Sequence, residues 1–484
     1  MKSLRSETIN AAKWGFIQKL TVQPIQLIYG MLLARLISPS EMGIVSLTAI
    51  FFAVATDISM AGFSSALIRK LDRTDADLNT MFWFNLTMSG IMGGALFLLA
   101  PWLASFYNQP ELIWLTRISS FMLFISSSTG VHLTLFQCKR DFRTLAILGM
   151  VSTFAGMPVC LILALYGYGV WALLAQQVVS ALVNMVMAWL FSPWKPRFSF
   201  SMTSFNELFG FGSKLAASSL LHTVYTNLRT FIIGKFYSPA QLGLYSRGEH
   251  LSLVFPSTVG GVLTTISYPI FANIQNDRKR LARAYCKYIK ISSLVIVWFC
   301  ITLAILAYPT IEIVYGKSWI PCAKYVQIIS LALACDHLCM INLNLLKIAG
   351  RSGALLKLEV IKKSISIGLL IYASTISVEA ICWAIFIYVH IAIYLNSYYS
   401  GDIIGLPWRK QLRYYMPYVA LALLTSIPAY FLTKTEINSI LQVLLGGSVS
   451  LVLYCSILRL FNDDALLELI EIAKIKLCKK RDNA

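Results

Sequence analysis

Charged residues are scarce in this sequence. Asp, Glu, Lys and Arg make up only 13% of the 484 residues, whereas hydrophobic residues make up 57%; a soluble domain carries roughly twice that charged fraction. Several runs contain no charged residue at all, among them Leu294–Tyr308, Leu369–Ser377 and Val419–Leu432. This composition leaves no room for a soluble domain and predicts a polytopic membrane protein. Its spans must be helices, because a helix satisfies its own backbone groups within lipid.

Patterns typical of metal sites, disulfides and catalytic centres are also missing. The 10 Cys are spread along the chain, and only Cys335 and Cys339 lie one helical turn apart, with His337 between them. A metal site needs more ligands than these, and no disulfide framework is implied. A membrane-bound polymerase or glycosyltransferase needs a large outer loop with paired catalytic groups, and the connections here are short. We therefore expect no metal, no cofactor and no enzymatic activity.

Basic residues outnumber acidic ones, with 41 Lys and Arg against 22 Asp and Glu and a formal net charge of +19. They are scattered between apolar spans and form no stripe or motif typical of nucleic-acid binding, so we expect no nucleic-acid partner. If the N-terminus is cytoplasmic, only six of them fall in outward connections: Arg35, Lys235, Arg247, Lys317, Lys324 and Lys434. The positive-inside rule then predicts an even number of spans, with both termini in the cytoplasm.

Apolar segments long enough to cross a bilayer recur along the whole chain, and we expect an all-α architecture of about fourteen transmembrane helices. Their expected ranges are 12–36, 43–68, 79–104, 112–137, 144–166, 169–191, 213–236, 244–274, 284–308, 320–346, 354–376, 379–399, 413–432 and 438–460. The expected domains are an N-terminal six-helix bundle (1–191), a cytoplasmic linker (192–212), a C-terminal six-helix bundle (213–400), helices thirteen and fourteen (401–462), and an amphipathic tail (463–484). We expect this tail to lie on the anionic cytoplasmic leaflet.

An internal repeat supports this division. Residues 33–46 and 233–246 align at an offset of 200 residues without a gap. The identical pairs are Ser38/Ser238, Pro39/Pro239, Gly43/Gly243 and Ser46/Ser246. The Ser-Pro and Gly matches lie at a turn, where chance agreement is rarer than among apolar helix residues. An even number of expected helices separates the two copies, so both run in the same direction. This predicts two six-helix parallel repeats related by a pseudo-two-fold axis along the membrane normal, with the substrate path between them.

Three features of this sequence resemble Wzx-type flippases of the multidrug/oligosaccharidyl-lipid/polysaccharide (MOP) exporter superfamily. They are the junction from Ala34 to Gly43, its second copy at 234–243, and the arrangement of six, six and two helices. The chain is most similar to the colanic-acid and teichuronic-acid exporter branch, over roughly its first twelve helices. This resemblance implies a MATE-like fold and the transfer of an undecaprenyl-pyrophosphate-linked oligosaccharide to the periplasmic leaflet, for capsule, O-antigen or exopolysaccharide assembly. We expect a monomer in contact with membrane lipid and with polysaccharide polymerase or assembly proteins.

Polar side chains follow one face of the first expected helix of each half. The first stripe comprises Lys19, Gln23 and Gln26, and the second comprises Ser218, His222, Tyr225 and Arg229. Ionisable groups within a membrane usually face a cavity or each other, and fixed cations are suitable counter-charges for a pyrophosphate. We therefore expect both stripes to contact substrate. The alternative for Lys19 and Arg229 is that each extends to the lipid headgroups.

Four further ionisable residues are candidates. Arg117 and Arg247 each lie near a helix end, so they could bind substrate or simply flank the membrane. Asp57 lies in mid-helix, where its short side chain cannot reach the headgroups. It is expected to titrate during transport or to pair with Lys19, and Glu249 is a second candidate for coupling. The alternative function is a multidrug exporter of organic cations driven by H⁺ or Na⁺. Such an exporter needs a cleft lined by acids, whereas both stripes carry a base.

Overall fold

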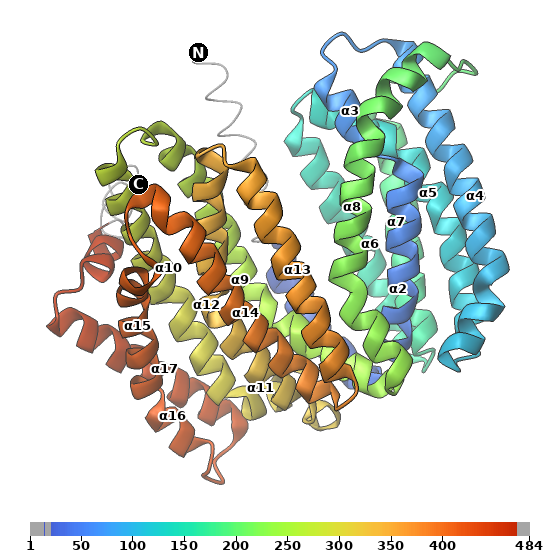
Figure 1. The fold of residues 1–484 in the computed structure, drawn as a ribbon. Coiled ribbons are helices and arrows are strands. Elements are labelled where there is room, and N and C mark those ends of the chain that lie inside the picture. Colours follow the sequence, from blue (N-terminus) through green and yellow to red (C-terminus); the bar gives the residue numbers. More distant parts are fainter. Residues whose placement is uncertain (1–13, 15–20, 472–484) are drawn as a thin grey trace, which may run out of the picture. The chain divides into compact units, whose positions relative to one another are not determined.

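The computed structural model describes residue 14 and residues 21–471, and within them it contains helices and no strands (Figure 1). Residues 21–36 are helical. The helices that follow are α2 (Pro39–Met60), α3 (Phe63–Arg69), α4 (Asp75–Tyr107), α5 (Leu112–Cys138), α6 (Phe142–Leu165), α7 (Val170–Phe191), α8 (Met202–Phe236) and α9 (Pro239–Asn273). Next come α10 (Arg278–Ile305), α11 (Ala307–Val314), the 3₁₀ turn η1 (Lys317–Trp319), α12 (Cys322–Ile348), α13 (Ser352–Ser374), α14 (Val378–Ile404), α15 (Trp408–Thr425), α16 (Ile427–Leu432) and α17 (Ser439–Leu460). The all-α fold class is confirmed.

Each expected helix overlaps a helix of the structure, and three of them are broken. The first break lies at Ala61 and Gly62, the second at Leu306 and the third at Ser426. Ten of the described helices or helix pairs are long and apolar enough to cross a membrane. The helices α8, α9 and α13 are not among these ten. In α8 and α13, polar and charged residues interrupt the apolar runs. The expected number of fourteen spans is therefore not confirmed by length and composition alone.

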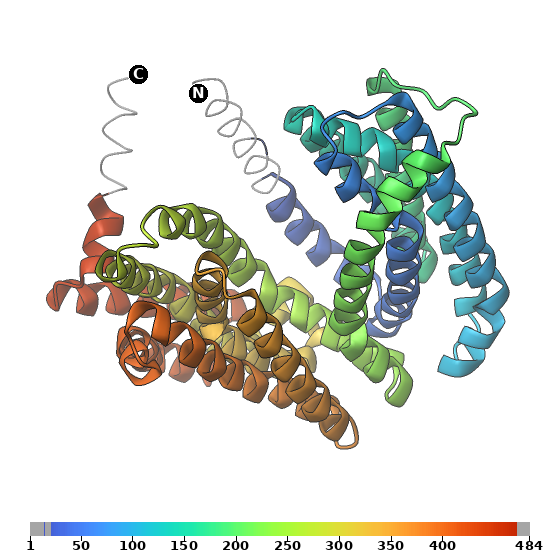
Figure 2. The ribbon, with the colours of Figure 1, turned by 45° about the horizontal axis from the view of Figure 1, so that its top comes forward.

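The chain forms two compact units, Met1–Gly243 and Leu244–Ala484. In the first unit α4 packs against α5, and α7 packs against α5 and α6. In the second unit α12 packs between α10 and α14, and α15 packs on α10. The expected linker contains the start of α8, since only residues 192–201 lack helix. Although α8 was expected to open the second bundle, it packs on α2, α3 and α4, and this contact places it in the first unit (Figures 1 and 2).

The repeated turn has a structural explanation at the starts of α2 and α9. The Ser38 amide donates to Glu41 Oε2 at 2.7 Å, and the Glu41 amide donates back to Ser38 Oγ at 3.3 Å. In the second copy, Ser238 and Gln241 exchange the same two hydrogen bonds, both at 3.3 Å. This reciprocal capping box satisfies two amide donors at each helix start, and the proline that follows the capping serine has a φ suited to the first helical position.

The two capped helix starts cross at their matched glycines. A Cβ added to Gly43 would lie 1.9 Å from the carbonyl oxygen of Pro239, and one added to Gly243 would lie 1.8 Å from that of Pro39. The contact is reciprocal, as expected for two copies of one element related by a two-fold axis. Residues 239–243 belong to the first compact unit, so this crossing is an internal contact of that unit.

A second close approach explains the break between α2 and α3. Ala61 and Gly62 have φ values of 43° and 71°, in the left-handed region, which glycine adopts without strain. A Cβ at Gly62 would lie 2.2 Å from the carbonyl oxygen of Gly212 in α8. The backbone of α8 therefore touches the α2–α3 corner, and this contact fixes α8 along α2.

We predict that Gly43→Ala destabilises the protein, since the new methyl group must displace the Pro239 carbonyl. Forcing a methyl group into such a packed contact costs about 1–3 kcal/mol. The measurement is the midpoint of thermal unfolding of the purified protein in detergent. Gly94→Ala in α4 is the matched control, because a Cβ there meets nothing within 4 Å. An equal or higher midpoint for Gly43→Ala than for Gly94→Ala would contradict the close crossing.

Candidate functional site

The polar stripe expected on the second copy lies on α8, in the first compact unit. His222 is exposed, whereas Tyr225 and Arg229 are half-buried. Hydroxyl and amide side chains between them add to the polar character of the helix: Thr226 donates to the His222 carbonyl at 3.0 Å, and Asn227 donates to the Thr223 carbonyl at 2.8 Å. The middle of α8 therefore presents a nearly continuous polar band.

Asp57 on α2 contacts this polar helix directly. Its Oδ2 accepts a hydrogen bond from Thr223 Oγ1 at 2.5 Å and a second from Ser219 Oγ at 3.3 Å. The structure thus brings the candidate coupling acid together with the helix that carries Arg229. Sequence reasoning missed Ser219 and Thr223. Their spacing of one helical turn puts them on a common face of α8, but only the packing of α2 against α8 reveals what that face contacts.

The first stripe is described only in part, because Lys19 lies outside the described residues. Gln23 is half-buried and Gln26 is exposed. One turn further along, the Tyr29 hydroxyl donates to Gln176 Oε1 of α7 at 2.9 Å. This hydrogen bond anchors the helix of residues 21–36 to α7 within the first unit, so Gln23 and Gln26 are carried by a helix with a fixed neighbour.

Arg117 lies apart from the α2–α8 group. Its guanidinium carbon lies 4.7 Å from the ring centroid of Phe97 and 5.3 Å from that of Trp114. None of these contacts involves α8. A cation placed over aromatic faces is stabilised by their quadrupoles, so the α4–α5 hairpin accounts for the position of this arginine without any ligand.

Arg247 and Glu249 lie on α9 and belong to the second unit. The Tyr245 hydroxyl donates to Glu249 Oε1 at 2.9 Å. Tyr315 lies in the connection that follows α11, and burial raises its pKa to about 12. The positive charge of Arg247 opposes this rise, which places Arg247 near that connection. Both candidates therefore have neighbours within their own unit.

A polar cavity of about 510 Å³ lies within the first unit, among α3, α5, α6 and α7. Its polar lining consists of hydroxyl and amide side chains: Ser64, Ser126, Thr129, Thr134, Gln137, Ser152, Ser180 and Asn184. No charged residue lines it. In the sequence, the many Ser and Thr residues of α5 were the signal that could have indicated this cavity. Hydroxyls and amides offer both donors and acceptors, so this cavity suits water or a neutral polyhydroxyl group better than an organic cation.

The Cys335, His337 and Cys339 group is buried in α12. His337 Nε2 shares a hydrogen bond with Ser293 Oγ at 3.0 Å. Within residue 14 and residues 21–471, no three His, Cys, Asp or Glu side chains are grouped in a way that could hold a metal ion. The close spacing of these three residues in sequence reflects core packing of α12 against α10.

Comparisons with known proteins agree with this architecture. A family model described as "Polysaccharide biosynthesis protein" matches residues 32–324. The succinoglycan biosynthesis transport protein ExoT of Rhizobium meliloti is 24% identical over 96% of this chain and 95% of its own length. The lipopolysaccharide biosynthesis protein WzxC of Escherichia coli is 23% identical over 66% of this chain and 65% of its own length. The teichuronic acid biosynthesis protein TuaB of Bacillus subtilis is 23% identical over 68% and 69%.

Two solved structures share the fold. The lipid II flippase MurJ, in an inward closed conformation, matches 93% of this chain and 99% of its own chain with a TM-score of 0.70 and 13% identity. An inward-facing multidrug resistance MATE family transporter of the MOP superfamily matches 78% of this chain and 94% of its own, with a TM-score of 0.61 and 17% identity. The expected MATE-like fold is confirmed.

We predict that the Thr223–Asp57 hydrogen bond gives a measurable coupling energy. Thr223→Val should lower thermal stability in the wild-type background, because a hydrogen bond to a charged group contributes about 1.5–3 kcal/mol. In the Asp57→Ala background the same substitution should have little effect. Thr226→Val is the matched control, since its hydroxyl bonds only to carbonyls of α8. If Thr223→Val and Thr226→Val shift the unfolding midpoint equally in both backgrounds, the α2–α8 polar contact does not exist as described.

Proposed function

We propose that this chain, which belongs to the polysaccharide biosynthesis protein family, is a flippase for an undecaprenyl-pyrophosphate-linked oligosaccharide and works by alternating access. It would serve the assembly of a capsule, O-antigen or exopolysaccharide. The observation that carries the proposal is the similarity to the succinoglycan transport protein, which extends over 96% of this chain. The named relatives act on different polysaccharides, so they support the class of substrate and leave the glycan open.

The chemistry of the first unit is consistent with such a substrate. A pyrophosphate carries several negative charges and must leave water to cross the membrane, so it needs fixed donors. We propose Arg229 as one donor, since a guanidinium can bind two phosphate oxygens at once, and Lys19 as a second. Gln23 and Gln26 lie on the helix of residues 21–36, and His222 and Tyr225 lie on α8. All four are proposed as further contacts. The uncharged polar cavity in this unit suits sugar hydroxyls.

Roles are also proposed for Arg117, Arg247, Asp57 and Glu249. Arg117 is already held over Phe97 and Trp114, so a substrate would have to compete with those rings for its guanidinium. Arg247 could contact substrate from α9. Asp57 and Glu249 are proposed as coupling groups, because each is a carboxylate within a helix that accepts a hydrogen bond from a neighbouring hydroxyl group.

The alternative, an exporter of organic cations, shares the fold but has less support from this chain. A cation-selective cleft needs acids that lack other strong partners. Asp57 is the acid beside the polar band of α8, and it accepts hydrogen bonds from two hydroxyl groups. The cavity of about 510 Å³ contains no acid in its lining. Both features speak against an organic cation, and the bases on the two polar stripes favour an anionic substrate.

Topology and assembly are proposed from the charge distribution. Basic residues concentrate in alternate connections, which supports an inner-membrane location with both termini in the cytoplasm. We propose that the chain works as a monomer and delivers its product to the polymerase or assembly proteins of the same polysaccharide.

The proposal predicts that Arg229→Ala lowers surface polysaccharide at least about tenfold, the effect of losing one charge-assisted hydrogen bond, while the protein still inserts into the membrane. Arg229→Lys should give an intermediate yield, because a lysine keeps the charge and loses the two-pronged geometry. The measurement is cell-surface polymer divided by the amount of protein in the membrane fraction. Lys357→Ala, which removes an exposed cation of α13, is the control. Normal polymer from Arg229→Ala would rule out this site.

A further inference from the structure

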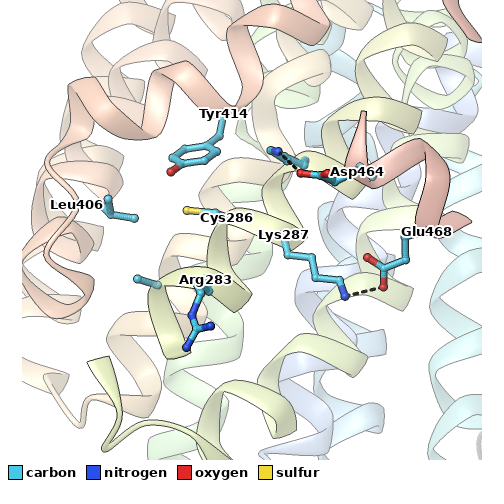
Figure 3. Close-up of a pocket in the computed structure, with 10 residues that line it drawn as sticks. Arg283, Cys286, Lys287, Leu406, Tyr414, Asp464 and Glu468 are labelled. Atoms are coloured by element: carbon cyan, nitrogen blue, oxygen red, sulfur yellow. Dashed lines mark hydrogen bonds and ion pairs between the residues drawn. The ribbon is translucent and has the colours of Figure 1, made fainter. Parts of the chain in front are cut away.

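A second cationic site lies in the second compact unit, away from α8 in the chain. A cavity of about 390 Å³ is bounded by α10, by the connection between α14 and α15, by the first turns of α15, and by a short helix over residues 464–471 (Figure 3). Arg283, Lys287 and Lys290 line it from α10, and Tyr414 and Leu406 line it from the other side. The three cations are spaced by four and three residues, so they share one face of α10.

The short helix supplies the negative charges of this cavity. Lys287 Nζ lies 2.5 Å from Glu468 Oε1, and Lys290 Nζ lies 3.3 Å from Asp464 Oδ2. Arg283 also lines the cavity, and no carboxylate among the described residues lies within ion-pair distance of it. Three cations therefore face two carboxylates, and the excess positive charge is at Arg283 (Figure 3).

The short helix is held by contacts other than these ion pairs. Asp463 caps its start by accepting from the amides of Ala465 and Leu466 at 3.0 and 3.1 Å, and it accepts from the Tyr418 hydroxyl at 2.8 Å. Ala465 and Leu466 are buried against α10, α15 and α17, with Leu469 and Ile470 beside them. The apolar side of residues 464–471 thus packs on protein helices, where the sequence suggested contact with the leaflet.

The ion pairs themselves are exchangeable. In each pair one side chain is largely exposed, Lys287 at 54% and Asp464 at 87%, whereas its partner is 32% or 30% exposed. Water reaches and screens both pairs, so each contributes little. A phosphate group could therefore replace either carboxylate without unfolding the helix, since the cap and the apolar packing would remain. The cavity lies on the first turns of α10, just before its long apolar run begins near Ile291, which is where lipid headgroups meet a membrane helix.

We infer that this cavity binds the phosphate headgroup of an anionic membrane phospholipid, which competes with Glu468 and Asp464 for the cations of α10. Arg283 and Lys287 hold the phosphate oxygens, and Tyr414 offers a hydroxyl donor. Basic pockets between membrane helices are suited to such headgroups. The inference concerns lipid binding and does not depend on whether the chain transports a lipid-linked oligosaccharide.

The test is native mass spectrometry of the full-length protein released from nanodiscs that contain cardiolipin or phosphatidylglycerol in phosphatidylcholine. Each cation near an anionic headgroup strengthens binding about fivefold, so Arg283→Ala with Lys287→Ala should lower anionic-lipid retention by more than about tenfold. Lys279→Ala with Lys410→Ala removes the same charge from exposed positions outside the cavity and should change it little. Asp464→Asn with Glu468→Gln should raise retention, because the competing carboxylates are gone.

The inference is overturned if the two double variants that remove cations lower anionic-lipid retention equally. It is also overturned if Asp464→Asn with Glu468→Gln does not raise this retention. Equal retention of phosphatidylcholine, or binding of free inorganic phosphate as tight as that of cardiolipin, overturns it as well. Cys286 gives a second measurement without any substitution, since it lines the same cavity. Its modification by a maleimide should slow when cardiolipin replaces phosphatidylcholine, whereas an unchanged rate speaks against an occupied cavity.

Discussion

The arrangement of the first unit depends on the crossing of two capped helix starts at Gly43 and Gly243. Each glycine lets the partner's proline carbonyl approach to a distance that any side chain would prevent. A second glycine contact, between Gly62 and Gly212, fixes the other end of α8 beside the α2–α3 corner. Held at both ends, α8 must run along α2, and Asp57 therefore meets Ser219 and Thr223. The repeated turn is thus the structural cause of the polar site.

This arrangement explains why α8 can be so polar. A helix with Arg229, His222 and a series of hydroxyls inserts poorly by itself, and α8 is not among the helices apolar enough to span a membrane by composition. Its contacts with α2, α3 and α4 supply the stability that its own sequence lacks. A polar segment kept in this way, against local preference, is typical of a functional element. We propose the α8 band as the place where the anionic head of a lipid-linked substrate binds.

The sequence predicted the helices well, because hydropathy and turn residues are local signals. Two of the three breaks lie shortly before Pro309 and Pro428, because a proline lacks the N–H of the helical hydrogen-bond ladder and its ring clashes with the carbonyl one turn earlier. The sequence also predicted the α8 stripe, Asp57 as a notable acid and the repeat. It could not predict that Thr223 donates to Asp57, that α8 packs within the first unit or that Glu468 pairs with Lys287. Each of these facts depends on which helices are neighbours, and a single sequence with hydrophobic surfaces on most helices does not specify that.

We conclude that this chain moves an anionic lipid-linked glycan between leaflets. The most direct measurement places the purified protein in vesicles with a fluorescent undecaprenyl-pyrophosphate saccharide and follows its exposure to dithionite, a reductant that does not cross the membrane. We expect the protein to accelerate the exchange of the labelled lipid between leaflets, and unlabelled undecaprenyl-pyrophosphate oligosaccharide to compete with it, whereas ethidium should not. No acceleration of lipid exchange, together with proton-driven ethidium transport by the same vesicles, would contradict this conclusion.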